Sequence, residues 1–568
     1  MKKLLFIIIT ALLILSLAAC STQEAAPTQT GAQETAPSTK PGQTPEITPE
    51  PTPEPTPVPT PEPTPEVITE YIETSPAVYS VSISEPSNPY NMEYQSQVDA
   101  ELSTQISSGQ FSMSAPFISI DPYGTNQLCM LVHFVDAEGY VSYTVNSPHS
   151  FASYTKKMGE ISSSHSLEVF GLFPNAENEI VVSLYNEHDQ LLKQATYTID
   201  VPSIRLSGVN DSNNPLSVTL VASEPGVSDG LFGMMGTIES GHGYENVYFY
   251  DNEGYLRGML ETSFRADTML QLGDSFLYPY NTKTIVHVSM LGKTLAIYNT
   301  ENYTMHHDLE VDKDGNIMAL VTKNGSGYKE DWMITIDKDT GEIIHEYDFK
   351  TLFGDNAGFY KLNGTDWLHA NSIDYIDQKG GNLIISSRES SMLFSITGVD
   401  TGEYILEYLI NEGTNTQKLG LEDLALAPIG EVNYCIGQHS AYYIPGNDEN
   451  HYQIVYYNNF YSRNSTSTSS SHPTGNLVKY EDIPGVDEKS FMSVLDIDTD
   501  SMTFSEAYTI EFRFSRIRSS AIKYEGNYIA SSTQIHQVVE VDADFNVVLE
   551  LLLRKSGVYR CNKYNIFD

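Results

Sequence analysis

Three histidine-containing segments in the C-terminal half of the sequence carry residue types that could transfer an anionic group. They are His306-His307-Asp308, Trp367-Leu368-His369-Ala370-Asn371 followed by Ser386-Ser387-Arg388, and Gly437-Gln438-His439-Ser440. A histidine is mostly neutral at pH 7, because its reference pKa is about 6.5, and a neutral imidazole is a nucleophile. A second histidine can act as acid or base, and an arginine adds a permanent charge with a planar fork of donors. We therefore expect one anion-transferring site, if the fold gathers the three segments.

A repeated turn indicates how the fold gathers them. His307, His369 and His439 each precede a Gly-Asn turn at a comparable distance. The turns are Asp314-Gly315-Asn316, Gly380-Gly381-Asn382, Pro445-Gly446-Asn447 and Glu525-Gly526-Asn527. A second kind of hairpin signal, acidic and turn-forming, recurs at Tyr250–Gly254, Tyr298–Asn302, Ile336–Gly341, Val399–Gly402, Ile497–Asp500 and Val541–Asp544.

These repeats predict an all-β fold for residues 205–568. The segment shows almost no helical periodicity, and the 38 Gly and 37 Tyr of the chain suit many short strands and tight turns. Repeats of about 60 residues fit four-stranded blades with insertions, such as a surface loop at Ser462–Gly475. A second sandwich or a jelly roll would not explain the shared register of the histidines. We predict a six-bladed β-propeller with the three histidines at the mouth of its central channel.

Residues 77–204 are predicted to form a small β-sandwich with a structural role. The sequence alternates turns with strand-like runs at Cys129–Val135, Gly139–Val145, Leu167–Phe170, Ile180–Tyr185 and Ala195–Val201. The segment from Leu172 to Val182 is similar to a corner of a fibronectin-type sandwich, although the tyrosine of that corner is replaced.

The first 76 residues are predicted to lie outside the folded part. Lys2-Lys3, the apolar run Leu4–Leu17 and the ending Leu17-Ala18-Ala19-Cys20 have the organisation of a lipoprotein signal, in which residues 1–19 are removed and Cys20 is lipidated. The apolar run is shorter than the ~20 residues that span a bilayer. Residues 20–76 are rich in Pro, Thr and Glu, which favours an extended tether. We expect an exported protein anchored by lipid to the extracytoplasmic face of a bacterial membrane.

The net charge of the chain limits the classes of partner that it can bind. The net charge is -43, with 74 acidic and 31 basic residues, which argues against a nucleic-acid partner because phosphate binding needs clustered Lys and Arg. An anionic substrate must then be attracted by a local positive site. Besides Cys20, the cysteines are Cys129, Cys435 and Cys561, whose wide spacing indicates neither a zinc site nor a redox motif. The spacing does not say which pair, if any, forms a disulfide.

Taken jointly, the quoted segments resemble the bacterial aryl-sulfate sulfotransferases. The family's hallmarks are an H-x-N segment followed by S-S-R, an HHD segment, and a Q-H segment, and the resemblance covers most of residues 210–568. It implies a six-bladed propeller behind a small β domain, with no cofactor and no nucleotide sulfate donor. By resemblance, His439 is the transiently sulfated nucleophile, His369 and Asn371 are the H-x-N pair, and Arg388 binds the sulfuryl group. The family's usual acidic turn after the nucleophile strand is replaced here by Tyr456-Tyr457-Asn458-Asn459.

The resemblance further implies a ping-pong reaction between small phenolic molecules. His439 would take the sulfuryl group from a phenolic sulfate donor, and a phenolic acceptor would remove it; water as acceptor would make the site a sulfatase. His369 would bind sulfuryl oxygens or serve as acid and base. Either His306 or His307 would bind the sulfuryl group, and the distance back from the Gly-Asn turn favours His307.

Two alternatives remain open. Three imidazoles with Asp308 could hold a divalent metal in a hydrolase, although Arg388 would then lie beside a cation and no H-x-H or H-E-x-x-H spacing occurs. The other alternative is a non-catalytic propeller that binds a ligand at the cell surface. The sequence indicates neither the oligomeric state nor the identity of donor and acceptor.

Overall fold

The computed structural model describes residues 69–148, 153–206, 213–237, 246–354, 365–412, 420–461 and 485–567. The predicted signal segment, Cys20, most of the tether and the predicted loop at Ser462–Gly475 lie outside these residues. Within them, no helix is long and apolar enough to cross a membrane. Cys129, Cys435 and Cys561 are buried free thiols.

The N-terminal part is a six-stranded sheet. Its strands are β1 (Glu70–Thr74), β2 (Phe117–Ile120), β3 (Cys129–Asn146), β4 (Tyr154–Phe170), β5 (Ala176–Tyr185) and β6 (Leu191–Val201). The order is β1-β6-β5-β3-β2, and β4 also pairs with β3. The parallel pairing of β1 with β6 means that a strand forms at residues 70–74, within the segment that composition assigns to the tether.

One long strand replaces two predicted ones. Cys129–Val135 and Gly139–Val145 were expected as separate strands, but both belong to β3, whose register shifts between Val135 and Gly139. Such a bulge bends a strand without ending it. The first half of β3 pairs with β2 and the second half with β5, and buried residues of both halves join one hydrophobic core.

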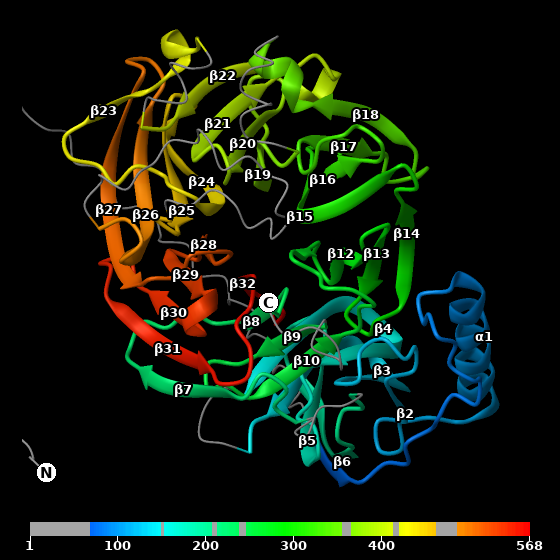
Figure 1. The fold of residues 1–568 in the computed structure, drawn as a ribbon. Helices are drawn as coiled ribbons and strands as arrows, with labels where there is room; N and C mark the ends of the chain where they lie inside the picture. The colour runs from blue at the N-terminus through cyan, green and yellow to red at the C-terminus, as the bar shows by residue number, and fades with distance from the viewer. Residues whose placement is uncertain are drawn as a thin grey trace, which may run out of the picture. The chain divides into compact units, whose positions relative to one another are not determined.

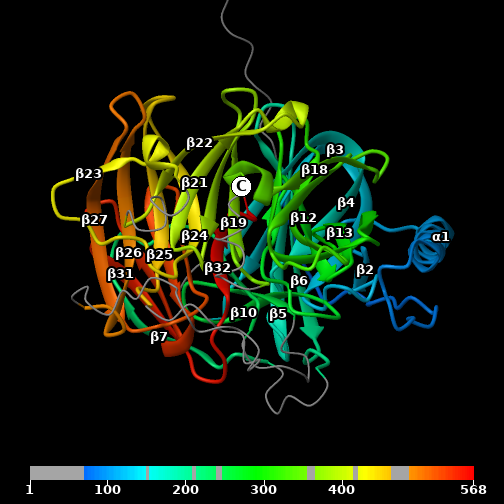
Figure 2. The same ribbon diagram turned by 45° about the horizontal axis from the view of Figure 1, so that its top comes forward.

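A helix, α1 (Met92–Ser108), interrupts the otherwise all-β chain and was not predicted. Asn91 caps it by accepting from the backbone N–H groups of Glu93 and Tyr94. Tyr94, Val98 and Leu102 recur at the spacing of one helical face and are buried against residues of β2 and β3. Figures 1 and 2 both place α1 at the outer edge of the N-terminal sheet, away from β19 and β24.

The other described strands form six sheets of four or five strands. In chain order they are β7 (Val218–Ser223), β8 (Leu231–Met235), β9 (Val247–Tyr250), β10 (Leu256–Leu260), β11 (Leu270–Gln271), β12 (Ser275–Asn281), β13 (Thr284–Ser289), β14 (Thr294–Asn299), β15 (Tyr303–Val311), β16 (Ile317–Lys323), β17 (Trp332–Ile336), β18 (Ile343–Asp348), β19 (Ala370–Ile376), β20 (Asn382–Ser387), β21 (Met392–Thr397), β22 (Ile405–Ile410), β23 (Ala427–Ile429), β24 (His439–Asp448), β25 (His451–Asn458), β26 (Lys489–Asp498), β27 (Thr503–Arg513), β28 (Ser520–Tyr524), β29 (Asn527–Ser532), β30 (Gln537–Val541), β31 (Val547–Leu553) and β32 (Arg560–Tyr564). Short 3-10 helices lie at Phe349–Phe353, Val399–Thr401, Glu422–Leu424 and Thr533–Ile535.

The six sheets follow one another around a common centre (Figure 1). Strands β15, β19, β24, β28 and β32 contact one another in succession, and we call them the inner strands. Hydrophobic cores lie between neighbouring sheets; for example, Leu383 and Phe394 pack against Leu320 of the preceding sheet. Strands from the two ends complete two sheets: β7 pairs with β31, and β32 pairs with β8. The arrangement is that of a β-propeller-like fold.

The predicted turns have consistent places in these sheets. Three of the four Gly-Asn turns join β15 to β16, β19 to β20 and β28 to β29, so each follows an inner strand. The fourth was wrongly predicted as a turn, because Pro445-Gly446-Asn447 lies within β24, at an irregularity between Ile444 and Asp448. Five of the six acidic turns join the third and fourth strands of a sheet, counted from its inner strand. The exception is Tyr298–Asn302, which lies between β14 and β15 and therefore connects two sheets.

Candidate functional site

The three predicted histidine segments meet on adjacent inner strands, two of them at the beginning of a strand and one at an irregularity within a strand. His307 lies at an irregularity of β15 between Met305 and Leu309, His369 immediately precedes β19, and His439 is the first residue of β24. The rings of His307 and His369 are 5.0 Å apart between centroids. The buried ring of Tyr559, which precedes β32, lies between the groups, 5.3 Å from His307 and 5.9 Å from His439.

A strained backbone conformation recurs at these strand beginnings. The φ angles of His307, His369, Ser440 and Arg518 are 57°, 52°, 58° and 59°. Side-chain-bearing residues rarely adopt this left-handed region, and such strain persists where the surrounding structure enforces it. Here it turns the chain into each inner strand at the point where the site residues lie.

The serines and the glutamine of the predicted motifs hold these segments together. Ser387 Oγ donates to the carbonyl of Leu368 at 2.6 Å, and the Arg388 N–H donates to the carbonyl of His369 at 3.1 Å. The amide of Gln438 donates to the carbonyls of Ser387 and Met392, both at 2.9 Å. The hydrogen bonds of these motif residues therefore hold β19, β20 and β24 together at the site.

His439 is held in one tautomer. The side-chain amide of Asn459 donates to the carbonyls of Ser515 and Arg518 at 2.7 and 2.9 Å, so its oxygen Oδ1 is the atom that faces His439 Nδ1 at 2.6 Å. Nδ1 must then carry the proton, and the lone pair of Nε2 accepts from the backbone N–H of Arg518 at 3.3 Å. Burial and the charge of Arg388 lower the pKa of His439 well below its usual value. His439 is a neutral imidazole whose unprotonated Nε2 is the nucleophilic atom once it releases the N–H of Arg518.

His369 has the opposite character. Its Nδ1 lies 2.6 Å from Glu330 Oε2 and 2.9 Å from Asp366 Oδ2. Burial alone would lower the pKa of His369, but Asp366 and Glu330 outweigh it and raise the pKa to about 10. The site thus holds one neutral and one protonated histidine.

Two donors face each other across a short gap. His369 Nε2 lies 3.3 Å from Arg388 Nη1. Because His369 is protonated at neutral pH, both atoms carry hydrogens and neither accepts from the other. An anionic oxygen placed beside them would accept from both, as in an oxyanion hole.

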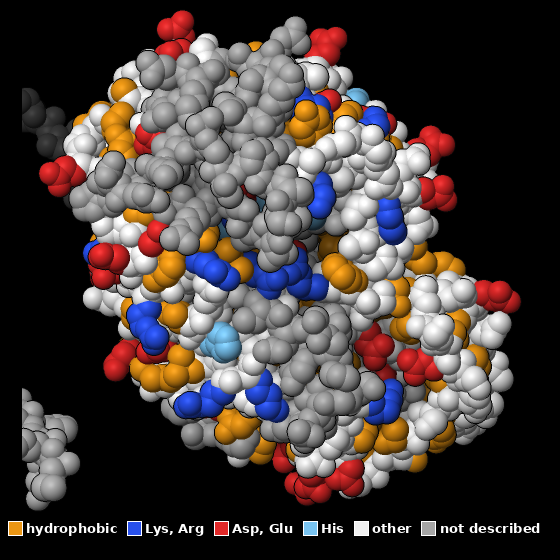
Figure 3. Space-filling model, viewed as in Figure 1, with side chains coloured by type: hydrophobic (Ala, Val, Ile, Leu, Met, Phe, Trp, Pro, Cys, Tyr) orange, Lys and Arg blue, Asp and Glu red, His pale blue; other side chains and the backbone are white. Residues whose placement is uncertain are grey.

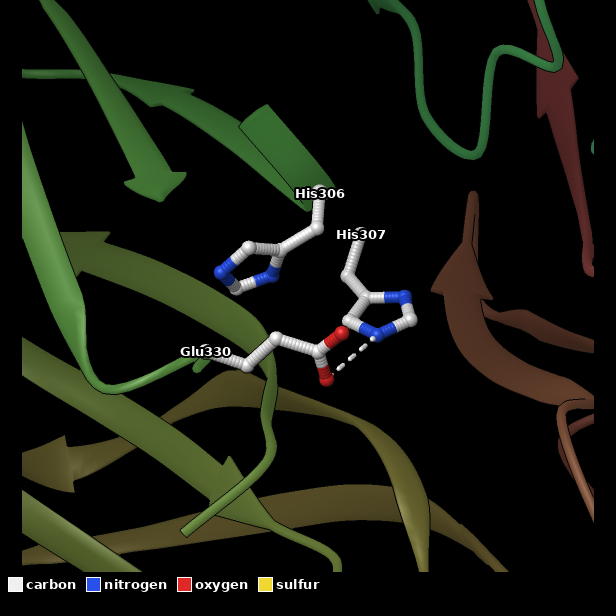
Figure 4. A group of neighbouring side chains, drawn as sticks. All are labelled: His306, His307 and Glu330. Atoms are coloured by element: carbon white, nitrogen blue, oxygen red, sulfur yellow. Dashed lines mark hydrogen bonds and ion pairs between the residues drawn. The ribbon is translucent and has the colours of Figure 1, made fainter. Parts of the chain in front are cut away.

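His307 faces the same carboxylate as His369. Its Nε2 lies 3.3 Å from Glu330 Oε2 (Figure 4). Its Nδ1 lies 3.5 Å from Asp267 Oδ2. The ring of His306 is 5.1 Å from that of His307, and burial lowers the pKa of His306 to about 4, so it is neutral. Only His307 of this pair stacks on Tyr559 and meets His369.

Asn371 links the strands of two histidines. Its Nδ2 donates to the carbonyl of Gln438 at 2.8 Å, and its Oδ1 is buried with no hydrogen-bond partner among the described residues. One hydrogen on Nδ2 remains available for a bound anion.

Asp308 of the HHD segment has a structural place. It forms a buried ion pair with Arg560, accepts from Thr268 Oγ1 at 2.9 Å, and accepts from the backbone N–H of Ile373 at 3.1 Å. Both carboxylate oxygens are therefore committed to joining β15, β19 and β32, which leaves Asp308 poorly placed as the metal ligand considered above.

Several residues of the site were not found from the sequence. Glu330, Asp366, Asn459 and Tyr559 lie outside the strand repeat, and no spacing indicates them. Arg518 is different, because it precedes Gly526 at the same distance at which His307 precedes Gly315, and both have the left-handed conformation. This shared distance to a Gly-Asn turn could have revealed Arg518 from the sequence.

Two groups of side chains have metal-ligand types within reach of one another: His306, His307 and Glu330, and Glu330, Asp366 and His369. Both share Glu330, whose pKa is held well below its usual range by His369 and His307 despite burial, which acts to raise it. In the second group His369 is protonated and offers no lone pair. Ion pairs therefore occupy the second group, whereas the first group, with its neutral His306, keeps the residue types of a metal site.

Comparisons with known proteins give the following matches. Residues 217–550, more than half of the chain, match the family model for Arylsulfotransferase (ASST), and residues 117–202 match that for the Arylsulfotransferase Ig-like domain. No curated protein matches. Among solved structures, a catalytically inactive virginiamycin B lyase from Staphylococcus aureus with quinupristin is 10% identical, with 61% of this chain and 89% of that chain covered and a TM-score of 0.31. An auxiliary nutrient binding protein from Bacteroides ovatus is 9% identical, with 76% and 87% covered and a TM-score of 0.29.

Proposed function

Because the chain belongs to the arylsulfotransferase family, we propose that it moves a sulfuryl group from a phenolic sulfate ester to a phenolic acceptor through a sulfohistidine at His439. The observation that carries the proposal is the fixed tautomer of His439. A buried, neutral imidazole with its lone pair on Nε2 is suited to attack sulfur.

In the first half-reaction, His439 Nε2 forms a bond to sulfur while the bond from sulfur to the aryl oxygen breaks. The leaving phenolate takes a proton from His369, whose pKa of about 10 matches that of a phenol. Asn459 Oδ1 accepts from Nδ1–H and so supports the positive charge that develops on the imidazole. The products are a phenol and a sulfated His439.

In the second half-reaction, the acceptor phenol attacks sulfur and gives its proton to the now neutral His369. The bond from sulfur to Nε2 breaks, and His439 regains its lone pair. Arg388, the remaining N–H of Asn371 and a histidine of the HHD segment, for which contacts favour His307 over His306, would hold the sulfuryl oxygens in both steps. No step uses a cofactor or a nucleotide.

We further propose that the six sheets are the blades of a six-bladed propeller closed by β7 and β32. The support is that hydrophobic cores fill the spaces between successive sheets and that both ends of the region pair across the closure. This closure would fix the inner strands, and with them the histidines, around one centre.

The location of the protein outside the cytoplasm is also a proposal, supported by the lipoprotein-like signal at residues 1–20. Lipidation would anchor the chain to a membrane through Cys20. Labelling of cells with a radioactive fatty acid should mark the wild-type protein and leave Cys20→Ser unlabelled; equal labelling would contradict the assignment.

Steady-state kinetics test the proposed reaction. Release of phenol from a chromogenic aryl sulfate should rise when a second phenol is added, and double-reciprocal plots should give parallel lines because a covalent intermediate separates the half-reactions. Intersecting lines would contradict the intermediate. A protein that only binds ligands would release no phenol.

The metal-dependent hydrolase is the second candidate, and the cluster of His306, His307 and Glu330 favours it. Prolonged chelation should leave sulfuryl transfer unchanged if the proposal is correct. Loss of activity on chelation, restored by zinc, would favour the hydrolase instead.

A further inference from the structure

Arg518 is fixed beside the nucleophile by its main chain. Its N–H faces His439 Nε2 at 3.3 Å, and its carbonyl accepts from Asn459 at 2.9 Å. Arg518 and Ser519 have φ angles of 59° and 81°, so the chain turns sharply there before β28 begins. The side chain therefore starts from a rigid point at the site.

Arg518 is an arginine without a matching carboxylate. Arg388 pairs with Glu389 at 3.2 Å, Arg265 pairs with Asp267 at 2.7 Å, and Arg560 pairs with Asp308. Within the described ranges Arg518 makes no ion pair, and its Nη1 is buried without a hydrogen-bond partner. Arg518 as a whole is partly buried, and a partly buried guanidinium without a matching anion is unfavourable unless an anion binds it.

The neighbours of Arg518 add to this positive charge. Burial and then the charge of Arg265 lower the pKa of Arg518, and only Asp267 and Tyr559 act in the other direction. Two guanidinium groups therefore share Asp267, which also faces His307. Glu330 also acts on Arg265, so the positive charge that lacks a close carboxylate of its own is that of Arg518. Figure 3 shows Lys and Arg side chains gathered near the centre of the face that Figure 1 presents.

A small cavity lies beside Arg265. It has a volume of about 90 Å³ and is lined by Phe264, Arg265 and His307 and by the carboxylates of Asp267, Asp308 and Glu330; Arg518 is not among its lining residues. A negative group bound by Arg518 would therefore lie outside this acidic cavity. Phe264 is 49% exposed, so its ring is available to pack against an aromatic substrate. The donors for the transferred group, His369 Nε2 and Arg388, lie elsewhere, beside each other.

We propose that Arg518, supported by Arg265, binds a second negative group of the substrate, so that the enzyme prefers phenolic sulfates that also carry a carboxylate. This inference rests on the proposed sulfuryl transfer and adds a substrate class to it. The carboxylate would neutralise the unmatched guanidinium while the sulfate ester lies between His439 and Arg388.

A matched pair of donors tests the inference. The donors are 4-(sulfooxy)benzoate and its methyl ester, which differ in one negative charge remote from sulfur. For wild type, kcat/KM should be about tenfold higher for the carboxylate, as expected for one charge-assisted contact. Arg518→Gln should reduce this ratio to about one. Arg516→Gln removes the same charge from an exposed position in the same loop and should leave the ratio unchanged.

The ratio separates the inference from a general loss of activity. If Arg518→Gln lowers kcat/KM equally for both donors, Arg518 acts on the transferred group and the inference is overturned. A wild-type ratio of one, or an unchanged ratio in Arg518→Gln, also overturns it.

A binding measurement tests the second anion site without turnover. In His439→Ala, the carboxylate donor should bind about tenfold more tightly than the ester, as for one charge-assisted contact, and the added change Arg518→Gln should remove the difference. If wild type releases no phenol from either donor, the proposed function fails, while this difference in Kd still decides whether the second anion site exists. Equal Kd values for the two donors in His439→Ala would overturn the inference.

Discussion

Asn459 Oδ1 lies 2.6 Å from His439 Nδ1, and this contact decides which nitrogen of the histidine is free to react. Since the amide nitrogen of Asn459 is committed to two backbone carbonyls, its oxygen cannot exchange places with it. The same asparagine therefore orients the loop that contains Arg518 and directs the lone pair of His439 toward the site.

Replacing Asn459 should change the behaviour of His439 without touching substrate. In Asn459→Asp the carboxylate still accepts from Nδ1–H, but its negative charge should raise the pKa of His439, so the acidic limb of the donor half-reaction should move to higher pH. Asn459→Leu leaves a buried N–H unpaired, at a cost of about 1–3 kcal/mol, and should lower the rate at all pH values. Pre-steady-state phenol release measures both. An acidic limb in the same place for wild type and Asn459→Asp would contradict the role of Asn459.

The wild-type pH profile of the donor half-reaction should have a broad plateau. The acidic limb reports protonation of His439 and should lie well below pH 6.5, because the pKa of His439 is lowered. The basic limb reports loss of the proton of His369 and should lie near pH 10, because that pKa is raised to about 10. Asp366→Asn removes one raising charge and should move the basic limb to lower pH. A limb unaffected by Asp366→Asn would remove His369 as the proton donor.

Arg388 should matter through its charge and its planar fork. Arg388→Met should lose about 2 kcal/mol or more of transition-state stabilisation, on the order of one oxyanion donor. Arg388→Lys keeps the charge but loses the fork, and should retain a small part of the activity. Near-normal kcat/KM in Arg388→Met would show that this residue does not contact the transferred group.

Asp308 should contribute to stability. Asp308→Ala leaves Arg560 buried without its carboxylate and should lower the free energy of unfolding by about 3–5 kcal/mol. Asp339→Ala is the control, because that carboxylate is 78% exposed and its ion pair with Lys338 should contribute little. Denaturant unfolding measures both. Unchanged stability with lost activity in Asp308→Ala would instead place Asp308 in the chemistry.

The strand repeat made much of this molecule predictable. Gly315, Gly381 and Gly526 follow inner strands and Gly446 lies near the end of one, so residues at similar distances before them were expected to share one end of the sheets. His307, His369 and His439 could be placed together in this way because the period of a repeated fold can be read from the sequence.

Residues that act from loops were beyond such reasoning. Glu330, Asp366 and Asn459 contact the histidines through connections of unequal length, and no period predicts them. Helix α1 was missed because its apolar face is the narrow row Tyr94, Val98, Leu102 and Ile106 among mostly polar residues. The single strand β3 was predicted as two because a bulge at residues 135–139 has the composition of a turn.

Mass spectrometry of the protein after brief exposure to an aryl sulfate donor, without acceptor, tests the sulfohistidine most directly. The peptide that contains His439 should gain the mass of one sulfuryl group, and addition of a phenol should remove it. His439→Ala should show no gain while remaining folded. A sulfuryl group found on His369 or His307, or no modification while phenol is released, would contradict the assignment of His439 as the nucleophile.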